Sequence, residues 1–282
     1  MYVTIRLKLL LSIILLSIVC IPDKAVCQTE QTLQSEQTQY SVGVGLGIND
    51  FHIKDEYVSP YPFRGGLFSS FLNFQARSGN NRHEVDIYFS TGRTNPEKQT
   101  FKSIEKMGSL SYSFMHQFGK WDVAGSPLGL FFGAGISSFA INSDLTTYSK
   151  LGEGSFHDHA WYWSHSFNIY ASSNYILSES QTISFTLNLP FFEMVSRPEN
   201  GHWMSSNNYN VMYNSFFNAV KGSKGEFLWD NFVVHCGITY SQKLNDRIAL
   251  QGTYGFNYTS SDRPLQMGMY MNNLLIGIGV IF

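Results

Sequence analysis

Alternation of apolar and polar residues dominates this sequence. From Tyr40 to Phe282, about ten segments carry an apolar or aromatic residue at every second position, as strands with one buried face do. These segments are 40–53, 65–77, 82–92, 108–118, 128–141, 161–176, 182–194, 231–242, 247–259 and 267–282. Because successive side chains of a strand point to opposite faces, we expect an all-β fold.

The composition is unlike that of a soluble domain. Aromatic residues make up 16% of the chain and charged residues only 14%, whereas soluble proteins average about 25% charged residues. After residue 27, no apolar run approaches the roughly 20 residues that a membrane-spanning helix needs. A membrane protein of this kind must satisfy its backbone in a closed barrel. We predict an antiparallel, up-and-down transmembrane β-barrel of about ten strands, with eight or twelve as alternatives.

The first 27 residues have the pattern of a secretory signal peptide. Arg6 and Lys8 precede an apolar run at 9–21, and the sequence AVC at 25–27 offers small residues for cleavage. We expect residues 28–39, which are polar and repetitive, to form a flexible periplasmic tail, and residues 40–282 to form the barrel. The chain after cleavage keeps one cysteine, Cys236, so it has no intramolecular disulfide.

The links between the segments indicate an orientation. Outer-membrane barrels have short periplasmic turns and longer extracellular loops. Links after the even segments are short, as at 78–81, 119–127, 177–181 and 243–246. Links after the odd segments are longer, as at 54–64, 93–107, 142–160 and 195–230, although the last, 260–266, is no longer than 119–127. Both ends of the barrel sequence should then face the periplasm.

One hairpin allows a residue-by-residue prediction. If 78–81 is the turn, Arg77 lies opposite Arg82, and the register continues outward along both strands. One face then pairs Gln75 with Glu84, Asn73 with Asp86, Phe71 with Tyr88 and Ser69 with Ser90; the other pairs Phe74 with Val85, Leu72 with Ile87 and Ser70 with Phe89. Apart from Phe71 and Tyr88, the first face is polar and should line the lumen, while the apolar face should meet lipid.

The last strand carries a family resemblance. Its outer residues, Leu274, Ile276, Ile278, Val280 and Phe282, resemble the C-terminal assembly signal of bacterial outer-membrane β-barrel proteins. The opening YSVGVGLGIND at 40–50 and Gln28 look like small barrels of the Bacteroidota. The resemblance implies a place in the cell outer membrane, contact with its lipid and recognition by the barrel-assembly machinery; it implies no activity. A net charge of −2 argues against nucleic acid as a partner.

The first and last strands are expected to pair and close the barrel. Val42, Val44, Leu46 and Ile48 would face lipid, with Gly43, Gly45 and Gly47 inside, as Gly277 and Gly279 are on the last strand. Bare backbone inside permits close approach by something that fills the barrel, such as the long loop or the polar tail. The alternative is that a narrow barrel needs small residues to taper.

His157 and His159, with Asp158 between them, are candidate metal ligands at the extracellular rim. Two histidines two positions apart can share a zinc-like ion, with Glu153 or His202 as further ligands. The alternative is a solvated polar loop. We assign no cofactor and no catalytic residue: none of the eight histidines has a serine two positions later, and His165 directly precedes Ser166, which puts the two on opposite faces of a strand.

Glu84 and Asp86 should both point into the lumen, roughly 7 Å apart. Paired carboxylates can perform acid–base chemistry. Because Arg77 and Arg82 lie just below them, we instead predict an ionic network that braces the lumen. The long link at 195–230 contains the apolar stretch 207–220, which we expect to fold onto the rim or into the mouth.

A barrel of this size is too narrow for a wide general porin, since sixteen strands or so are needed for an open water channel. The sequence favours a non-enzymatic barrel that acts in surface binding, envelope integrity or selective passage of small solutes, with an extracellular ligand or a periplasmic partner that it does not identify. One alternative is a lipid- or peptide-hydrolysing barrel with its site at the rim near His157, Asp158, His159 and His202. Another is a barrel subunit of a secretion or uptake complex.

Overall fold

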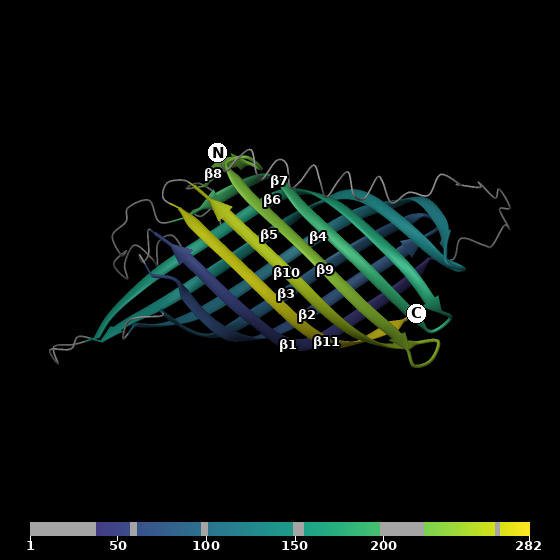
Figure 1. Ribbon diagram of the computed structural model, residues 1–282, viewed down its shortest axis with the longest axis horizontal. Helices are drawn as coiled ribbons and strands as arrows, with labels where there is room; N and C mark the ends of the chain where they lie inside the picture. The colour runs from purple at the N-terminus through teal and green to yellow at the C-terminus, as the bar shows by residue number, and fades with distance from the viewer. Residues whose placement is uncertain (1–37, 57–60, 97–100, 149–154, 198–222, 263–265) are drawn as a thin grey trace. The chain divides into compact units, whose positions relative to one another are not determined.

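The chain forms a closed antiparallel β-barrel of ten strands, with one short additional strand (Figure 1). The computed structural model describes residues 38–56, 61–96, 101–148, 155–197, 223–262 and 266–282. The strands are β1 (Gln39–Asp55), β2 (Phe63–Ser78), β3 (Asn81–Pro96), β4 (Phe101–Val123), β5 (Ser126–Tyr148), β6 (Ser155–Ser178), β7 (Gln181–Ser196), β8 (Lys224–Phe227), β9 (Asn231–Lys243), β10 (Ile248–Ser261) and β11 (Met267–Ile281).

The connectivity is up-and-down, as predicted. Apart from the short strand β8, strands that follow one another in sequence are neighbours. Strand β11 pairs with β1 from Ser41 opposite Ile281 to Asp55 opposite Met267, which closes the barrel. Strand β7 pairs along one edge with β6; its other edge pairs with β9 over its first half and with β8 near its end. The ten-strand prediction and the pairing of the first and last strands are therefore confirmed.

The register predicted for the β2–β3 hairpin is also confirmed. Arg77 lies opposite Arg82, and the predicted pairs follow in order as far as Ser69 opposite Ser90. The turn contains Gly79 with φ 55°, which suits the first central position of a two-residue hairpin turn. A tight turn of the right chemistry fixes the register of both strands, and the register decides which side chains enter the lumen.

Tight turns lie at one end of the barrel, together with its two chain ends. The turns are 79–80, 124–125, 179–180 and 244–247. The amide of Tyr40 donates to the carbonyl of Phe282, and the amide of Phe282 donates to the carbonyl of Tyr40. The predicted turn at 119–127 was wrong. Strands β4 and β5 continue to Val123 and Ser126, because Ala124 and Gly125 adopt positive φ (55° and 80°) and reverse the chain in two residues.

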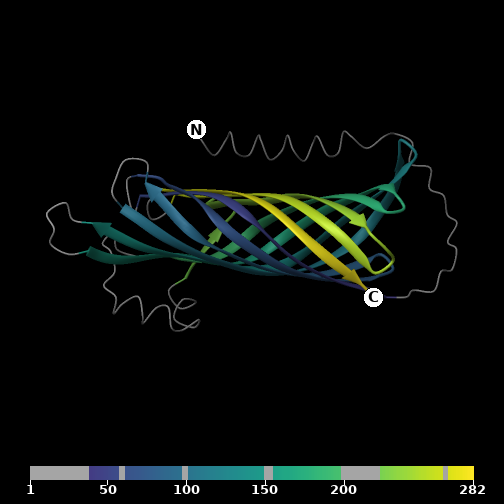
Figure 2. The same cartoon turned by 90° about the horizontal axis from the view of Figure 1, so that it is seen from below.

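Strands β4, β5 and β6 are longer than the others, and the β5–β6 pair extends past the other strands at the opposite end (Figure 2). The extra length of β4 lies at the turn end, beyond its last pair with β3, which is Asn81 opposite His116. The pairing of β5 with β6 continues to Tyr148 opposite Ser155, and that of β4 with β5 reaches Phe101 opposite Thr147. The predicted links at 93–107 and 142–160 were therefore wrong over most of their length. In these segments the backbones stay paired beyond the last residues that alternate between apolar and polar, and the strand ends were predicted from that alternation.

The outer face of the barrel is an apolar belt. On the first and last strands it is formed by exposed residues at alternate positions, namely Val44, Leu46, Ile48, Leu274, Ile276, Ile278, Val280 and Phe282. On the remaining strands it continues through residues such as Phe68, Phe89, Leu110, Ile136, Phe167, Phe185, Ile238 and Leu250. The predicted lipid face of β1 and β11 is the face that the structure exposes. No helix in the described ranges is long and apolar enough to cross a membrane.

The glycines at the β1–β11 seam are covered by an aromatic ring. Gly45 lies opposite Gly277, and a Cβ at either position would overlap the ring of Phe71 and the backbone of the neighbouring strand. Phe71, which the polar pattern of the lumen face did not explain, fills the space that the glycines leave. This favours the interpretation that the narrow barrel needs small residues here.

Replacing Gly45 with alanine is therefore expected to destabilise the barrel. The added Cβ would overlap the carbonyl oxygen of Ile276, and overpacking of this kind costs about 1–3 kcal/mol. Gly43→Ala is a matched control on the same strand and face, because its Cβ would find its nearest atoms at 3.4 Å and 3.8 Å. Urea unfolding in lipid vesicles measures both; an equal midpoint for the two variants would contradict the packing described.

Candidate functional site: a filled lumen

Two arginines occupy the turn end of the lumen. The guanidinium groups of Arg82 and Arg77 lie 4.6 Å and 5.5 Å from the centre of the Phe131 ring. Arg82 is buried, and its Nε lies 3.8 Å from Glu84 Oε2. Arg77 Nη2 donates to Gln117 Oε1 at 3.1 Å. An aromatic face attracts both cations, so they stay close together in a confined space.

Above the arginines, the carboxylates of Glu84 and Asp86 share one amide. Asn73 Nδ2 lies 3.0 Å from Glu84 Oε1 and 2.7 Å from Asp86 Oδ1. Ser111 donates to the other oxygen of Asp86 at 3.4 Å. The four predicted network residues thus line one wall, but only Arg82 and Glu84 form an ion pair among the described residues. Whether they act as a brace stays a prediction.

Tyr88 is the hub of the next layer. Its hydroxyl donates to Asn273 Oδ1 on β11 at 2.8 Å, accepts from Asn49 Nδ2 on β1 at 3.2 Å, and lies 2.8 Å from Ser69 Oγ on β2. The hydroxyl group therefore connects β3 to β1 and β2 on its own side of the β1–β11 seam and to β11 on the other side. This explains why an aromatic residue occupies a lumen position that the sequence pattern assigned to polar side chains.

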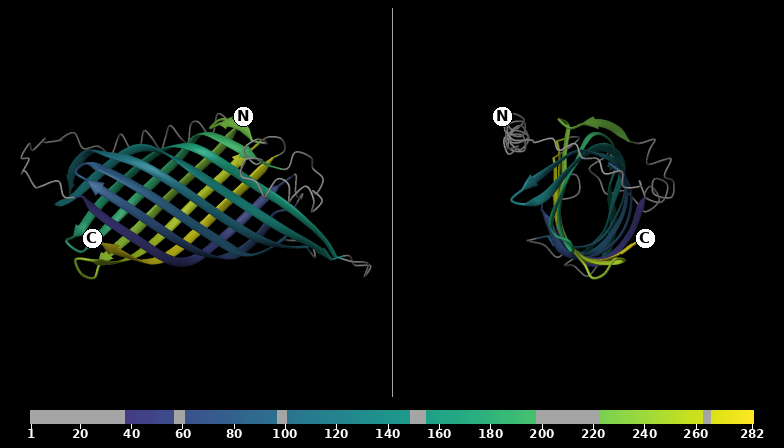
Figure 3. Two further views of the ribbon diagram at one scale, coloured as in Figure 1. Left: turned by 180° about the vertical axis from the view of Figure 1, so that it is seen from behind. Right: turned by 90° about the vertical axis from the view of Figure 1, so that its right-hand side faces the viewer.

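An apolar layer crosses the lumen above Tyr88. Its first part contains the buried residues Phe51, Leu67, Met107, Ile141, Met269 and Met271, from β1, β2, β4, β5 and β11. Its second part brings Met267 of β11 together with Tyr162 of β6 and Val195 of β7, and Phe139 packs against both parts. Because β11 and β6 belong to opposite walls of the barrel (Figure 3), these contacts span the lumen.

Polar and charged groups form the uppermost layer. Arg197 Nη2 lies 2.7 Å from Asp55 Oδ1, and the two side chains are only 4% and 7% exposed. Asn231 Nδ2 donates to Glu193 Oε2 at 2.5 Å and to the hydroxyl of Tyr162 at 3.1 Å. These bonds join β1 and β9 to β6, β7 and the residue that follows β7. The buried carboxylates of Asp55 and Glu193 each have a partner outside their own strand.

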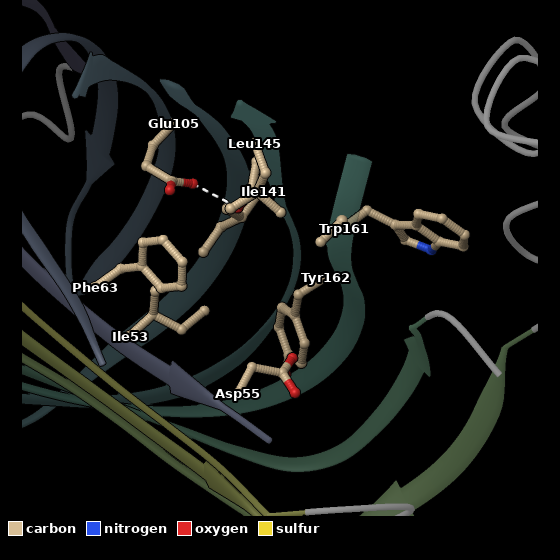
Figure 4. Close-up of a pocket in the computed structure, with 10 residues that line it drawn as sticks. Ile53, Asp55, Phe63, Glu105, Ile141, Leu145, Trp161 and Tyr162 are labelled. Atoms are coloured by element: carbon tan, nitrogen blue, oxygen red, sulfur yellow. Dashed lines mark hydrogen bonds between the residues drawn. The ribbon is translucent and has the colours of Figure 1, made fainter. Parts of the chain in front are cut away.

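A small pocket remains in this layer (Figure 4). It is lined by Ile53, Asp55, Phe63, Glu105, Ile141, Ser143, Leu145, Ala160, Trp161 and Tyr162. Glu105 points into it and accepts hydrogen bonds from Ser143 at 2.5 Å and Thr94 at 2.9 Å. The cavity volume is about 20 Å³, enough for a water molecule and too small for an organic ligand.

The predicted histidine site lies largely outside the described residues. The backbones of His157 and His159 belong to β6, opposite Thr146 and Asp144, so the prediction that they lie in a loop was wrong. Their side chains, with Asp158, Glu153, His202 and the stretch 207–220, lie outside what the structure describes. Within the described part, no three His, Cys, Asp or Glu residues come together as metal ligands. Metal binding by His157 and His159 stays a prediction.

A serine–histidine pair was missed by sequence reasoning. His165 Nδ1 and Ser138 Oγ lie 2.7 Å apart and share a hydrogen bond between β6 and β5. They are on the outer face, each two positions from an exposed belt residue, Phe167 and Ile136 respectively. The partners are 27 residues apart in sequence, so a search for His and Ser at close spacing could not find them.

No protein family matches the sequence, and no curated protein is significantly similar to it. Solved structures with a similar fold include the outer membrane protease OmpT from Escherichia coli (10% identity, 89% of this chain and 99% of that chain, TM-score 0.48). Others are Neisserial surface protein A (13%, 87% and 99%, 0.36) and a major outer membrane protein from Thermus thermophilus (10%, 87% and 99%, 0.35). No activity is transferred from them.

The chain's own features decide where the protein resides. Each of the ten long strands pairs with a neighbour on both sides, the outer face is apolar, and the lumen is mostly polar away from one apolar layer. A bilayer admits strands only in such a barrel, and the outer membrane of Gram-negative bacteria is where barrels of this type occur. The protein is an outer-membrane β-barrel.

Proposed function

We propose that this outer-membrane barrel is non-enzymatic and closed to solutes, and that it acts at the cell surface in binding or in envelope integrity. The observation that carries the proposal is the apolar layer, in which Met267 of β11 packs with Tyr162 of β6, on the opposite wall, and with Val195 of β7. A solute pathway requires a continuous polar passage. Side chains from both walls meet where that passage would run.

The layers above and below support the same conclusion. Asp55 and Arg197 join β1 to the end of β7, and Tyr88 joins β3 to β11. The pocket between Glu105 and Tyr162 has room only for water. A small barrel can be filled by its own side chains, so the long-loop end, with the extended strands β5 and β6, is the part that can meet a partner.

Single-channel recording of the refolded protein in a planar bilayer tests the proposal. We expect no conductance from the full chain, and none from a variant that lacks residues 198–222, because the side-chain layers that fill the lumen lie outside the deleted range and remain in the variant. An outer-membrane porin in the same bilayer serves as the positive control. Conductance in both proteins would establish an open pore, and conductance only after the deletion would establish a pore closed by the loop; either result would overturn the proposal.

A second candidate function rests on Ser138 and His165. The hydrogen bond between Ser138 Oγ and His165 Nδ1 has the geometry of a nucleophile and its base. Since both residues face outward beside the apolar belt, the accessible substrate class would be membrane-lipid esters. A lipid-hydrolysing site formed by this pair would lie on the outer wall of the barrel, and not at the rim near His157 and His159.

Labelling with a fluorophosphonate probe separates the two candidate functions. For a non-enzymatic barrel, we expect no labelling of the folded protein in phospholipid vesicles. Labelling that disappears in Ser138→Ala but persists in Ser137→Ala, a change at the neighbouring inward-facing serine, would establish the hydrolase. Release of fatty acid from the vesicle lipid provides an independent measurement.

A further inference from the structure

Basic residues gather on the outer face of β1–β4, just above the apolar belt. Along β4 the belt residue Leu110 is followed, toward the long-loop end, by Lys106 and Lys102 on the same face. On β1, β2 and β3, the basic residues Lys54, Arg64 and Arg93 likewise lie on the outer face, on the long-loop side of the belt residues. The basic patch consists of five exposed residues, Lys54, Arg64, Arg93, Lys102 and Lys106.

The strand register places Arg93 at the centre of the basic patch. Arg64 lies opposite Asn95, two residues from Arg93, and Arg93 lies opposite Ile104, two residues from both Lys102 and Lys106. Diagonal neighbours of this kind are about 7–8 Å apart. Across the two strand spacings from β2 to β4, the basic groups extend over about 10 Å.

The acidic partners lie at the sides of the basic patch. Asp50 holds Arg64 at 3.3 Å and 3.2 Å, and Asp144 holds Lys106 at 2.9 Å. Lys54 pairs with Glu56 at 3.4 Å. Among the described residues, no carboxylate lies within ion-pair distance of Arg93. Within the described ranges, Asp50, Glu56 and Asp144 each pair with one member of the patch, and none of the three pairs with Arg93.

The opposite wall differs at the same height. The outward positions level with His52 are Tyr270 on β11 and Tyr258 on β10, and the ring of Phe232 on β9 lies 6.2 Å from that of Tyr258. The described outward residues there are aromatic, as in the interfacial girdle common to membrane barrels. Among the described residues of β9, β10 and β11, none near the long-loop end is basic, so the basic patch is not part of a girdle that runs around the whole barrel.

We propose that the basic patch binds a glycolipid with two phosphate groups in the outer leaflet of the membrane. Arginine forks and lysine ammonium groups are the side chains that bind phosphate. Exposed belt residues directly below the patch, such as Phe68, Phe89 and Leu110, provide the apolar surface for its acyl chains. The spacing of the basic groups suits two phosphates rather than one. This inference depends on the membrane position of the barrel and is independent of whether its lumen conducts.

The binding test uses the full chain in phosphatidylcholine nanodiscs. Bisphosphorylated lipid A is the probe, and native mass spectrometry measures its occupancy. Lipid A without phosphates, phosphatidylglycerol and inorganic phosphate are the comparison ligands. We expect retention of the bisphosphorylated lipid alone, weakening as salt rises because the contacts are exposed.

Two sets of variants locate the binding. Arg64→Gln, Arg93→Gln and Lys106→Gln combined should weaken retention at least about tenfold, since each removes a charge-assisted contact. Lys120→Gln, Lys243→Gln and Arg247→Gln, exposed at the turn end, form the matched control and should leave it unchanged. Arg93→Gln alone breaks no described ion pair and should weaken retention a few-fold. This single variant provides the test if the triple variant fails to fold.

Three results would overturn the proposal. Equal retention by the patch variants and the control variants would mean that the basic patch is not the binding surface. Retention of lipid A without phosphates would mean that the acyl chains alone are bound. Equal retention of phosphatidylglycerol would mean a general attraction for anionic lipid, without the two-phosphate spacing.

Discussion

Replacement of Arg197 with methionine is expected to destabilise the barrel by about 3–5 kcal/mol, since it leaves the carboxylate of Asp55 buried without its cation. The two groups are 2.7 Å apart and almost fully buried, at 4% and 7% exposure. Because methionine keeps most of the side-chain volume of arginine, the loss of stability measures the effect of removing the charge. Urea unfolding in detergent micelles, followed by tryptophan fluorescence, gives the free energy of unfolding.

The double variant supplies the control for this prediction. Asp55→Asn combined with Arg197→Met removes both charges, and a buried pair replaced by neutral groups is often close to neutral in stability. We therefore expect the double variant to be more stable than Arg197→Met alone. If the losses of the two single variants simply add, the ion pair contributes nothing, and the description of the upper layer would have to change.

The second large effect is expected at the centre of the lipid face. Ile278 is 51% exposed and lies midway along the apolar face of β11 that runs from Leu274 to Phe282. Arginine there would cost about 2–4 kcal/mol, the range for a basic residue at the bilayer midplane of a barrel. Unfolding in phospholipid vesicles and the heat-dependent shift on SDS gels both measure the loss.

Leu244→Arg is the matched control for Ile278→Arg. Leu244 is 62% exposed and lies in the turn between β9 and β10, outside the belt. A charge there stays in water, so we expect a change of less than about 1 kcal/mol. Equal losses in the two variants would mean that Ile278 does not face lipid.

Much of the fold follows from local sequence signals. Alternation marks the two faces of each strand, and turn residues such as Gly79 fix the register, so the β2–β3 pairing could be predicted residue by residue. Strand ends were less predictable. Strands β5 and β6 continue to Tyr148 and from Ser155 because backbone pairing is indifferent to side-chain polarity. Strand β8, only four residues long, has too little sequence for a periodic signal.

The contents of the lumen could be predicted only in part. The inward direction of Arg82 and Glu84 followed from the register, and their ion pair joins residues two apart on one strand. The bond between Asp55 and Arg197 joins residues 142 positions apart, and that between Tyr88 and Asn273 joins residues 185 apart. Such partners are brought together by the curvature and closure of the sheet, which no local pattern specifies.

The inner face of β11 couples closure of the barrel to the packing of its lumen. Met267, Met269 and Met271 lie at the centre of the apolar layer, and Asn273 accepts the hydrogen bond from Tyr88. A nascent barrel that contains only the first nine long strands lacks the middle of its core as well as its closing edge. Closure of the sheet and packing of the lumen therefore depend on the same strand, so a change that displaces β11 is expected to disturb both together.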